Sequence, residues 1–408
     1  MSQLPLDGVT VLDFGQVYNG PYCGFLLAQA GARVIKVESP LGETLRGRAG
    51  GRAGSRAGGR DESTAASYPF ALLNSGKACV TLNIKSPAGQ RLLKRLAREV
   101  DVVLENFSPG TMARYGVGSE ALLAENQRLV YAASTGFGGS GPYRDYLGMD
   151  ITLQAVTGVM SITGEDGTPP TKAGPALADF MGGVHLFGAI VAALYRRSVD
   201  GSGCVIDISM QDCLFPALST ALGAYFLAGH QPPRTGNRHA AMSAAPYNVY
   251  RAADGHVAII CIREGHWRNL VAAMGRPELL EREAFADMAS RARNMDALDA
   301  EVERWTASLP KAEVFRIAQA HDVICAPVKS LEEVVNDPQL HARGTLEWVD
   351  HPSLGRIALC HSPLRFDGRE LPPLSEVPYL GADNRNVYCG LFGLSDAELK
   401  ALADEDAI

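Results

Sequence analysis

Short apolar runs alternate with longer amphipathic segments through the first half of the chain. Helix-like patterns at residues 22–30 and 86–98 lie between such runs. Apolar strands that alternate with helices predict a mostly parallel α/β sheet. The predicted strands are residues 9–14, 32–38, 80–83, 101–107, 129–134 and 204–209.

Loops rich in glycine, asparagine, serine and proline follow several of these strands. They include a turn at residues 19–21 and loops at 74–77, 105–110 and 134–142. Parallel sheets bind ligands at the carboxyl ends of their strands, so these loops predict the binding edge. The first of them lacks a G-x-G-x-x-G phosphate fingerprint, so the pattern does not indicate a nicotinamide or flavin nucleotide.

The second half of the chain predicts a different unit. Helix-like patterns at 150–159, 184–195 and 211–227 precede a proline-containing linker at 229–236. A hairpin pattern, charged helices and a strand at 323–328 then suggest a small α+β domain. Strand patterns return near residues 346 and 357, and Ser395 with Glu398 form a capping box. We predict a large domain at 1–228, a small domain at 229–330, and a return to the large domain at 331–408.

A single carboxylate, Asp179, stands in an uncharged stretch of small residues at 174–183. An apolar helix pattern follows it. An aspartate at this place usually caps the helix by accepting a backbone N–H. The other interpretation is an accessible carboxylate at a helix N-terminus, with glycines that let a ligand approach and with the chemistry of a covalent nucleophile. The pattern alone leaves both interpretations open.

Composition narrows the classes of protein. The chain has 408 residues, 46% hydrophobic residues and a net charge of −7, which is typical of a globular enzyme and does not indicate nucleic-acid binding. Eight cysteines without a C-x-x-C pair predict reduced thiols, a cytoplasmic location and no metal site. Because no uncharged apolar run approaches about 20 residues, we expect no membrane span.

One segment, residues 42–60, is unusual. It holds five arginines among glycines, alanines and serines, so we expect a mobile surface loop. The alternative is a lid that closes over the site, in which Arg46 contacts a carboxylate or a phosphate group of a ligand.

Several short motifs in order resemble the class III CoA-transferase family, also called the CaiB/BaiF family. They span nearly the whole chain. The matching segments are 6–14 with Gly20-Pro21, 31–38, 74–77, 105–110, 134–138, 178–183, and 336–339 with Arg343-Gly344.

The resemblance implies a fold and a reaction. The fold is a Rossmann-like large domain and a smaller domain in a ring-shaped subunit, with two rings interlocked in a homodimer. CoA and its thioesters are substrates, and no cofactor is bound permanently. Asp179 attacks an acyl-CoA, and an acyl-aspartyl anhydride and then an aspartyl-CoA thioester form. The favoured donor is succinyl-CoA and the favoured acceptor a small dicarboxylic acid.

The resemblance also implies site residues. Gln16, Tyr18 and Asn19 line the reacting end, and backbone N–H groups near Gly182 and Gly183 stabilise the oxyanion. Residues implied in CoA binding are Leu73, Asn74, Lys77, Asn106, Phe107, Arg114, Gly136, Phe137 and Gly138. Ser39 stands where some members have a CoA-binding arginine. A glycine-rich loop of the oxalate-specific members is not visible between 237 and 262, which disfavours oxalate as the acceptor.

Two alternatives share the resemblance. An α-methylacyl-CoA racemase needs two bases, and its histidine position is Met149 here, before Asp150. A thioether accepts no proton, so the sequence favours the transferase. A non-catalytic CoA-binding subunit of a hetero-oligomer is the second alternative, and the presence of Asp179 argues against it.

Overall fold

The computed structural model describes residues 4–46, 67–368, 370–374 and 378–408, which divide into two compact units. The first contains residues up to 153, 175–214 and 337–408, and the second contains 154–174 and 215–336. The second unit therefore takes in residues before 229. The division of the chain into domains at 1–228, 229–330 and 331–408 stays a proposal.

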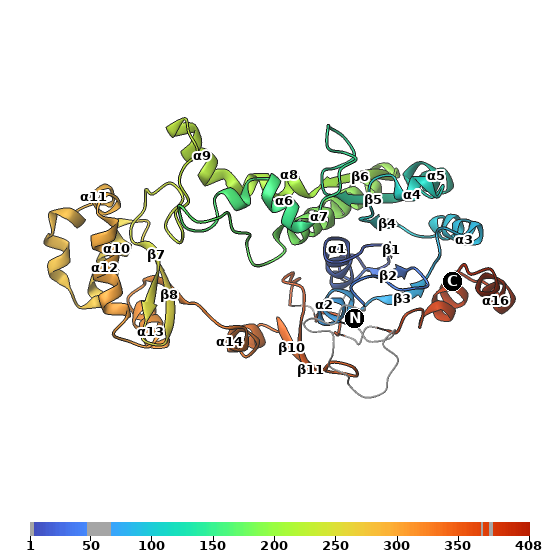
Figure 1. Ribbon diagram of the computed structural model, residues 1–408. Coiled ribbons are helices and arrows are strands. Elements are labelled where there is room, and N and C mark those ends of the chain that lie inside the picture. Colours follow the sequence, from blue (N-terminus) through green and yellow to red (C-terminus); the bar gives the residue numbers. More distant parts are fainter. Residues whose placement is uncertain (1–3, 47–66, 369, 375–377) are drawn as a thin grey trace. The chain divides into compact units, whose positions relative to one another are not determined.

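The first unit is built on a six-stranded parallel sheet in the order β3-β2-β1-β4-β5-β6 (Figure 1). This confirms the predicted α/β class. The strand order reverses between β1 and β4, and in doubly wound sheets ligands bind at this point, beyond the carboxyl ends of the strands. The strands are β1 Thr10–Asp13, β2 Arg33–Glu38, β3 Ala78–Thr81, β4 Val102–Glu105, β5 Val130–Thr135 and β6 Cys204–Ser209.

Helices cover both faces of this sheet. One core contains Leu93 of α3 and Tyr388, and the other contains Leu27 of α1 with Leu186 and Ile190 of α7. These apolar faces fill the space between sheet and helices and remove the strands from water. The helices of this part are α1 Asn19–Gln29, α2 Tyr68–Asn74, α3 Pro87–Ala97, α4 Thr111–Arg114, α5 Ser119–Glu125, α6 Asp150–Val156, α7 Leu177–Asp200 and α8 Met210–Leu214.

Prolines explain two differences from the predicted elements. The expected turn at 19–21 is the first turn of α1, where Pro21 needs no hydrogen-bond acceptor for its nitrogen. The single helix expected at 211–227 is wrong. Pro216 interrupts it, because proline lacks an N–H and clashes with the preceding turn. A 3₁₀ turn, Phe215–Leu218, separates α8 from α9 Ser219–Ala228.

The C-terminal segments cover the edge of the sheet that is formed by β3. The N–H of Cys79 donates to Asp383, the N–H of Thr81 donates to Asn384, and the hydroxyl of Tyr388 donates to the carbonyl of Thr81. An edge strand with satisfied N–H groups does not pair with other chains. The capping box at Ser395 and Glu398 is confirmed. The elements are α15 Pro338–Ala342, β10 Leu346–His351, β11 Gly355–Cys360, the π-helix Arg385–Leu391 and α16 Asp396–Asp404.

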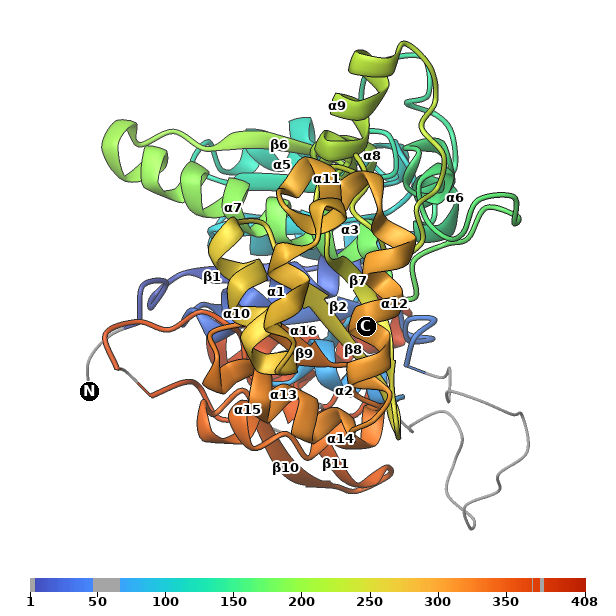
Figure 2. The ribbon, with the colours of Figure 1, turned by 90° about the vertical axis from the view of Figure 1, so that its left-hand side faces the viewer.

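The second unit holds an antiparallel sheet, β7-β8-β9, with helices beside it (Figure 2). The predicted hairpin and return strand are confirmed. Its core includes Trp267, Leu270, Leu298 and Val314, from three different helices. The elements are β7 Tyr247–Ala252, β8 Gly255–Ile260, α10 Glu264–Met274, α11 Met288–Arg293, α12 Met295–Thr306, α13 Lys311–Ala320, β9 Ile324–Pro327, α14 Leu331–Val335 and the 3₁₀ turns Val159–Ser161, Pro277–Glu281 and Glu283–Phe285.

Helix α7 alone, among the described segments, has the length and apolar composition of a membrane span. Its uncharged stretch is interrupted by Asp179 and Arg196, so the expectation of no membrane span stays a prediction. In the structure the helix packs against α1, β5 and β6, and Leu186, Ile190 and Leu194 belong to the core of the first unit, whereas Tyr195 and Val199 are exposed. Core helices of this kind have the same composition. All eight cysteines are free thiols.

Candidate active site

Asp179 is the third residue of α7, and it does not cap the helix. The N-cap position is Ala176, whose side chain offers no acceptor. The N–H of Ala178 donates instead to the carboxylate of Asp150, at 2.8 Å. The capping interpretation of Asp179 is therefore wrong, because another segment supplies the cap.

The carboxylate of Asp179 is buried without compensation. Asp179 is 8% exposed, its side chain makes no capping hydrogen bond, and among the described residues no cation contributes to the shift of its pKa. Burial, and then the negative charge of Asp150, raise the pKa of Asp179 to about 7. A carboxylate with this pKa is more basic than an ordinary aspartate and is about half ionised at neutral pH.

Two glycines let α1 approach α7 closely. A Cβ on Gly182 would lie 2.2 Å from the side-chain nitrogen of Asn19, and one on Gly183 would lie 2.7 Å from the carbonyl of Asn19. Asn19 also donates to the carbonyl of Asp179, at 3.3 Å. The expected oxyanion role of these glycines is corrected, because their N–H groups lie inside α7 and bond to its own carbonyls.

Aromatic rings surround the first turn of α7. The ring of Phe180 lies 4.8 Å from that of Tyr22 and 6.0 Å from that of Tyr18. Both tyrosines are half-buried. Apolar walls of this kind keep water from a carboxylate and strengthen electrostatic effects there.

The loop after β1 is held by its neighbours. The N–H of Gln16 donates to Asn106 at 2.7 Å, and the amide of Asn106 donates back to the carbonyl of Gln16 at 2.9 Å. Val17 has a φ of 63°, and its N–H donates to Glu43. A valine in this conformation is strained, so the surrounding bonds must hold it. Asn106 thus positions the loop, while the side chain of Gln16 stays half-exposed.

The ammonium of Lys77, which was expected to bind a phosphate, is hydrogen-bonded within the protein. It donates to Asp13 at 2.7 Å, to the carbonyl of Pro21 and to the side chain of Asn74. The side chains of Lys77 and Asp13 are both 0% exposed. Leu73 and Asn74 are buried as well. A fully hydrogen-bonded buried ammonium has no donor left for a ligand. Lys77, Leu73 and Asn74 therefore support the edge of the sheet.

The expected contact of Arg46 with a carboxylate or a phosphate of a substrate is corrected for the same reason. Its guanidinium forms two hydrogen bonds with Glu38, at 3.0 and 2.6 Å, and lies 4.2 Å from the centre of the Phe70 ring. A third bond goes to the carbonyl of Pro378. Arg46 is buried and does not replace the arginine missing at Ser39. The rest of the predicted lid, residues 47–60, lies outside the described residues.

The loop after β4 retains accessible CoA-binding candidates. Phe107 is half-buried, and its ring lies 6.5 Å from that of Phe14. Arg114 is exposed and bonds only to the nearby Thr111, among the side chains described. An exposed guanidinium suits a phosphate.

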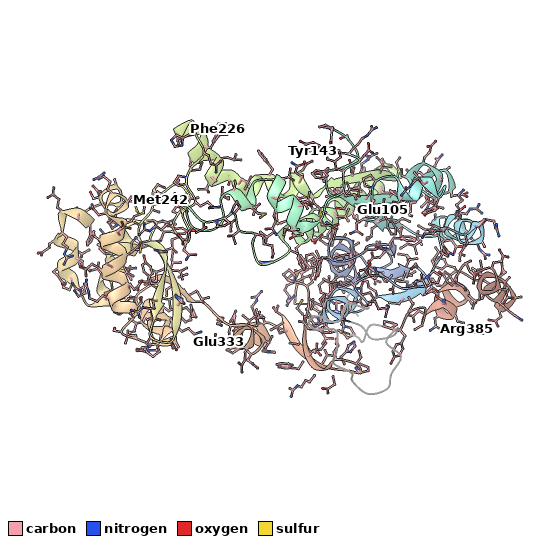
Figure 3. All side chains as sticks on the ribbon, in the orientation of Figure 1. Glu105, Tyr143, Phe226, Met242, Glu333 and Arg385 are labelled. Atoms are coloured by element: carbon pink, nitrogen blue, oxygen red, sulfur yellow. The ribbon has the colours of Figure 1, made fainter. Side chains whose placement is uncertain are left out.

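Sequence reasoning missed Glu105, which lies at the end of β4 (Figure 3). Its carboxylate accepts the N–H of Phe107 at 2.7 Å and the hydroxyl of Tyr131 at 3.1 Å. Burial raises the pKa of Glu105 to about 7. The residue continues an apolar strand pattern, so nothing but its charge distinguished it in the sequence.

The loop after β5 places aromatic rings near the same edge. Gly138 has a φ of 80° and donates its N–H to Thr135. The ring of Phe137 lies 5.5 Å from that of Tyr143, which stacks on Tyr146 at 5.0 Å. Gly136 packs against Gly148, which precedes Met149 and Asp150. The two tyrosines had no signal in the sequence beyond their glycine-rich surroundings.

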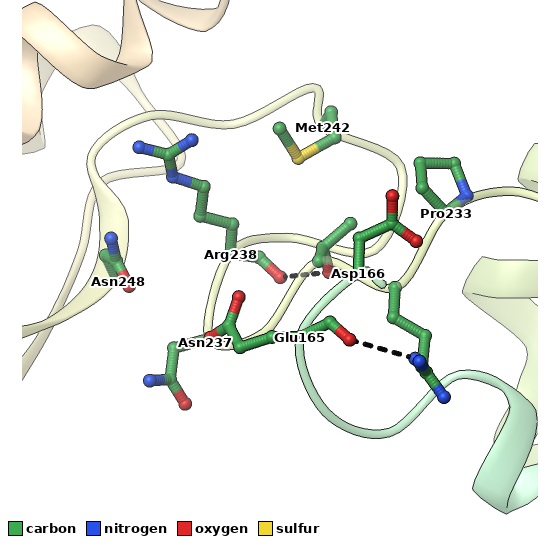
Figure 4. A pocket seen from close by; sticks show the side chains of 9 residues that line it. Glu165, Asp166, Pro233, Asn237, Arg238, Met242 and Asn248 are labelled. Atoms are coloured by element: carbon green, nitrogen blue, oxygen red, sulfur yellow. Dashed lines mark hydrogen bonds between the residues drawn. The ribbon is translucent and has the colours of Figure 1, made fainter. Parts of the chain in front are cut away.

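A separate polar pocket of about 580 Å³ lies within the second unit (Figure 4). Arg234 donates to the carbonyl of Glu165 there, and Arg238 is paired with Asp296 and Asp299. Arg238 is thus neutralised by carboxylates and Arg234 is held by backbone carbonyls, so we assign the pocket no ligand. The lining residues are Glu165, Asp166, Pro233, Arg234, Thr235, Asn237, Arg238, Met242 and Asn248.

The first unit therefore defines a class of protein: a doubly wound α/β fold that presents a buried, uncompensated carboxylate at a helix N-terminus. The sequence model of CoA-transferase family III matches residues 6–384, so the chain belongs to this family. It is an enzyme of this class.

Known relatives cover nearly the whole chain. A formyl-CoA:oxalate CoA-transferase of Streptomyces avermitilis is 33% identical over 99% of both chains. A succinyl-CoA:mesaconate CoA-transferase of Haloarcula marismortui is 34% identical over 92% of this chain and 93% of its own. The crystal structure of a CaiB/BaiF family protein from Brucella suis has a TM-score of 0.81 at 32% identity, covering 96% of this chain and 100% of that one.

Proposed function

We propose that this enzyme transfers CoA from an acyl-CoA donor to a carboxylic acid, with Asp179 as the covalent carrier. The observation that supports this most is the buried carboxylate of Asp179, which meets no cation or donor in the described part of the chain. An ordinary structural carboxylate at that depth is paired.

Each step exchanges one acyl bond for another. A carboxylate oxygen of Asp179 attacks the thioester carbonyl, the C–S bond breaks, and the electron pair leaves on sulfur. The CoA thiolate then attacks the aspartyl carbonyl of the anhydride and releases the donor acid. The acceptor carboxylate attacks the resulting aspartyl thioester, and the thiolate finally takes the acceptor acyl group and restores Asp179. Two reactive intermediates thus replace one slow exchange.

No step transfers a proton, so Asp179 reacts only when ionised. A pKa of about 7 keeps a large ionised fraction in a neutral medium while making the carboxylate more basic than a solvated one. The apolar rings of Tyr22 and Phe180 limit hydrolysis of the intermediates by keeping water away.

Binding of CoA is assigned to the loops after β4 and β5. Arg114 offers an exposed guanidinium to a phosphate, and Phe107 offers an aromatic face. Gly136, Phe137 and Gly138 contribute the second loop. We propose succinyl-CoA as the donor and a small dicarboxylic acid as the acceptor, supported by the name of the Haloarcula relative. The Streptomyces relative places oxalate among the acids to be tested.

The test is a matrix of acyl-CoA donors and acids, with products identified by mass spectrometry. We expect transfer from succinyl-CoA to a dicarboxylate and an Asp179 hydroxamate when hydroxylamine is added during turnover. Deuterium exchange at the α-carbon of a 2-methylacyl-CoA without any transfer would instead establish the racemase. Transfer without any adduct on Asp179 would refute the covalent mechanism.

We further propose that the enzyme is a cytoplasmic homodimer of interlocked subunits. Helix α9 supports this, because only Ala221 of its residues is buried within the chain. Phe226 is 77% and Leu227 is 91% exposed, and Figure 3 shows Phe226 on this helix. Apolar side chains in such number indicate a contact with another protein surface. Light scattering that finds a stable, active monomer would refute the dimer.

A further inference from the structure

The first turn of α7 depends on a residue from outside the helix. The first four N–H groups of a helix need acceptors other than helix carbonyls. Here the N–H of Ala178 donates to Asp150, which is the first residue of α6 and lies 28 positions earlier in the sequence. Because Ala178 directly precedes Asp179, this bond fixes the backbone that carries the nucleophile.

The cap also brings a second negative charge to the nucleophile. A serine or an asparagine would satisfy the same N–H group without a charge. The carboxylate of Asp150 is half-buried, and the site supplies Asp179 with no positive partner among the described residues. Two carboxylates near one another in a partly dry site disfavour simultaneous ionisation.

We propose that Asp150 is a positioning residue for the nucleophile: its hydrogen bond holds the first turn of α7, and its charge makes ionised Asp179 less stable than acylated Asp179. This inference rests on the proposed function. When the aspartyl oxygen attacks the thioester, a C–O bond forms, the C–S bond breaks and the negative charge leaves on sulfur. The repulsion at Asp179 is relieved in that step, so it favours acylation.

Other titratable groups around the first turns of α7 do not duplicate this charge. Burial raises the pKa of the Tyr22 phenol, so this group brings no negative charge to the site. His185 bonds to the carbonyl of Met181 in α7. Of the carboxylates on the packed elements β6 and α8, Asp207 bonds to Gly139, and Asp212 is exposed. The raised pKa of Asp179 agrees with this, because burial is its largest cause and the charge of Asp150 is its second cause.

Two substitutions separate the hydrogen bond from the charge. Asp150→Asn keeps an oxygen that accepts the N–H of Ala178 but removes the charge. We expect the acidic limb of its kcat/KM profile to move to lower pH by about one unit, and kcat above pH 8 to fall several-fold. Asp150→Glu keeps the charge, so its acidic limb should stay near that of the wild type, even if the longer side chain lowers kcat.

Asp287→Asn is the matched control, because Asp287 also caps a helix, α11, by accepting the N–H of Ser290. Its profile should equal that of the wild type. A merely structural role of Asp150 would lower activity in both Asp150 variants without moving the limb, and this result would overturn the proposal. Unfolding midpoints show whether each variant is folded.

Hydroxylamine capture separates this inference from the proposed function. We expect Asp150→Asn to yield the Asp179 adduct with its rate profile shifted in the same direction as kcat/KM. An adduct in both proteins with identical pH profiles overturns the role of Asp150 and leaves the transferase mechanism standing. No adduct in the wild type, with full activity of Asp179→Ala, overturns the mechanism itself.

Discussion

Two groups of buried charges lie at the carboxyl edge of the same sheet, and they are arranged in opposite ways. Around the ends of β1 and β2, three buried cations form ion pairs with carboxylates. Lys77 pairs with Asp13, Lys36 lies 3.6 Å from Glu43, and Arg46 pairs with Glu38. At the start of α7, the only charged group among the described residues that shifts the pKa of Asp179 is another carboxylate, Asp150. The charges of the first group lie next to opposite charges, although burial still lowers the pKa of Lys77, whereas Asp179 loses an unpaired charge when it reacts.

This contrast shows which loop residues hold the site and which perform chemistry. Lys77 and Asp179 both lie in motifs shared with the family, and both are buried. Only their partners differ. A satisfied buried charge stabilises the fold, and an unsatisfied one indicates a functional site.

The largest expected effect is on catalysis. Asp179→Ala should lower kcat by about 10⁴-fold or more, because both covalent intermediates are lost. CoA binding, measured by calorimetry, should change little. A variant with more than about one hundredth of the wild-type rate would contradict the nucleophilic role.

Breaking the paired group should instead affect stability. Lys77→Met leaves Asp13 buried without its cation, and we expect about 3–5 kcal/mol less stability in urea titrations. Asp13→Asn combined with Lys77→Met should recover part of this loss. Lys85→Met, at an exposed lysine, is the control. Unchanged stability with a raised KM for the acyl-CoA would restore the phosphate-binding interpretation of Lys77.

The unpaired carboxylate should make stability depend on pH in a definite direction. The folded pKa of Asp179, about 7, lies above its unfolded value of about 3.9, so its contribution to stability is complete below pH 3.9 and is lost as pH rises through 7. The stability of Asp179→Asn relative to the wild type should therefore rise by about 2 kcal/mol between pH 5.5 and pH 8. Thermal unfolding at the two pH values measures this. An equal difference at both would contradict the raised pKa.

The smallest effect is expected for an ion pair on the surface. Arg95 lies 2.9 Å from Glu398, but both side chains are exposed to water. Solvent screens such a pair, and ordering two long side chains offsets most of its attraction. Arg95→Ala should leave the unfolding midpoint within measurement error. A loss as large as that of Lys77→Met would mean that burial does not distinguish the two kinds of pair.

Much of the fold follows from local sequence. The six apolar runs became the six parallel strands, because a strand buried on both faces needs a continuous apolar pattern. Asp337 and Pro338, part of a family motif, start α15 as cap and first residue. Pro216 also indicated in the sequence that the predicted 211–227 helix is interrupted. The continuous apolar pattern nevertheless led to the prediction of a single helix.

Sequence and structure thus contribute different parts of the site. The sequence by itself determined the strands, the loops at their carboxyl ends and the prominence of Asp179, since these depend on patterns within a few residues. Only the tertiary structure decided that Asp150 caps α7, that Lys77 and Arg46 are already paired, and that Glu105 is buried below the loop of Phe107. The energy of a charge depends on partners that are distant in the sequence, and the fold alone brings them together.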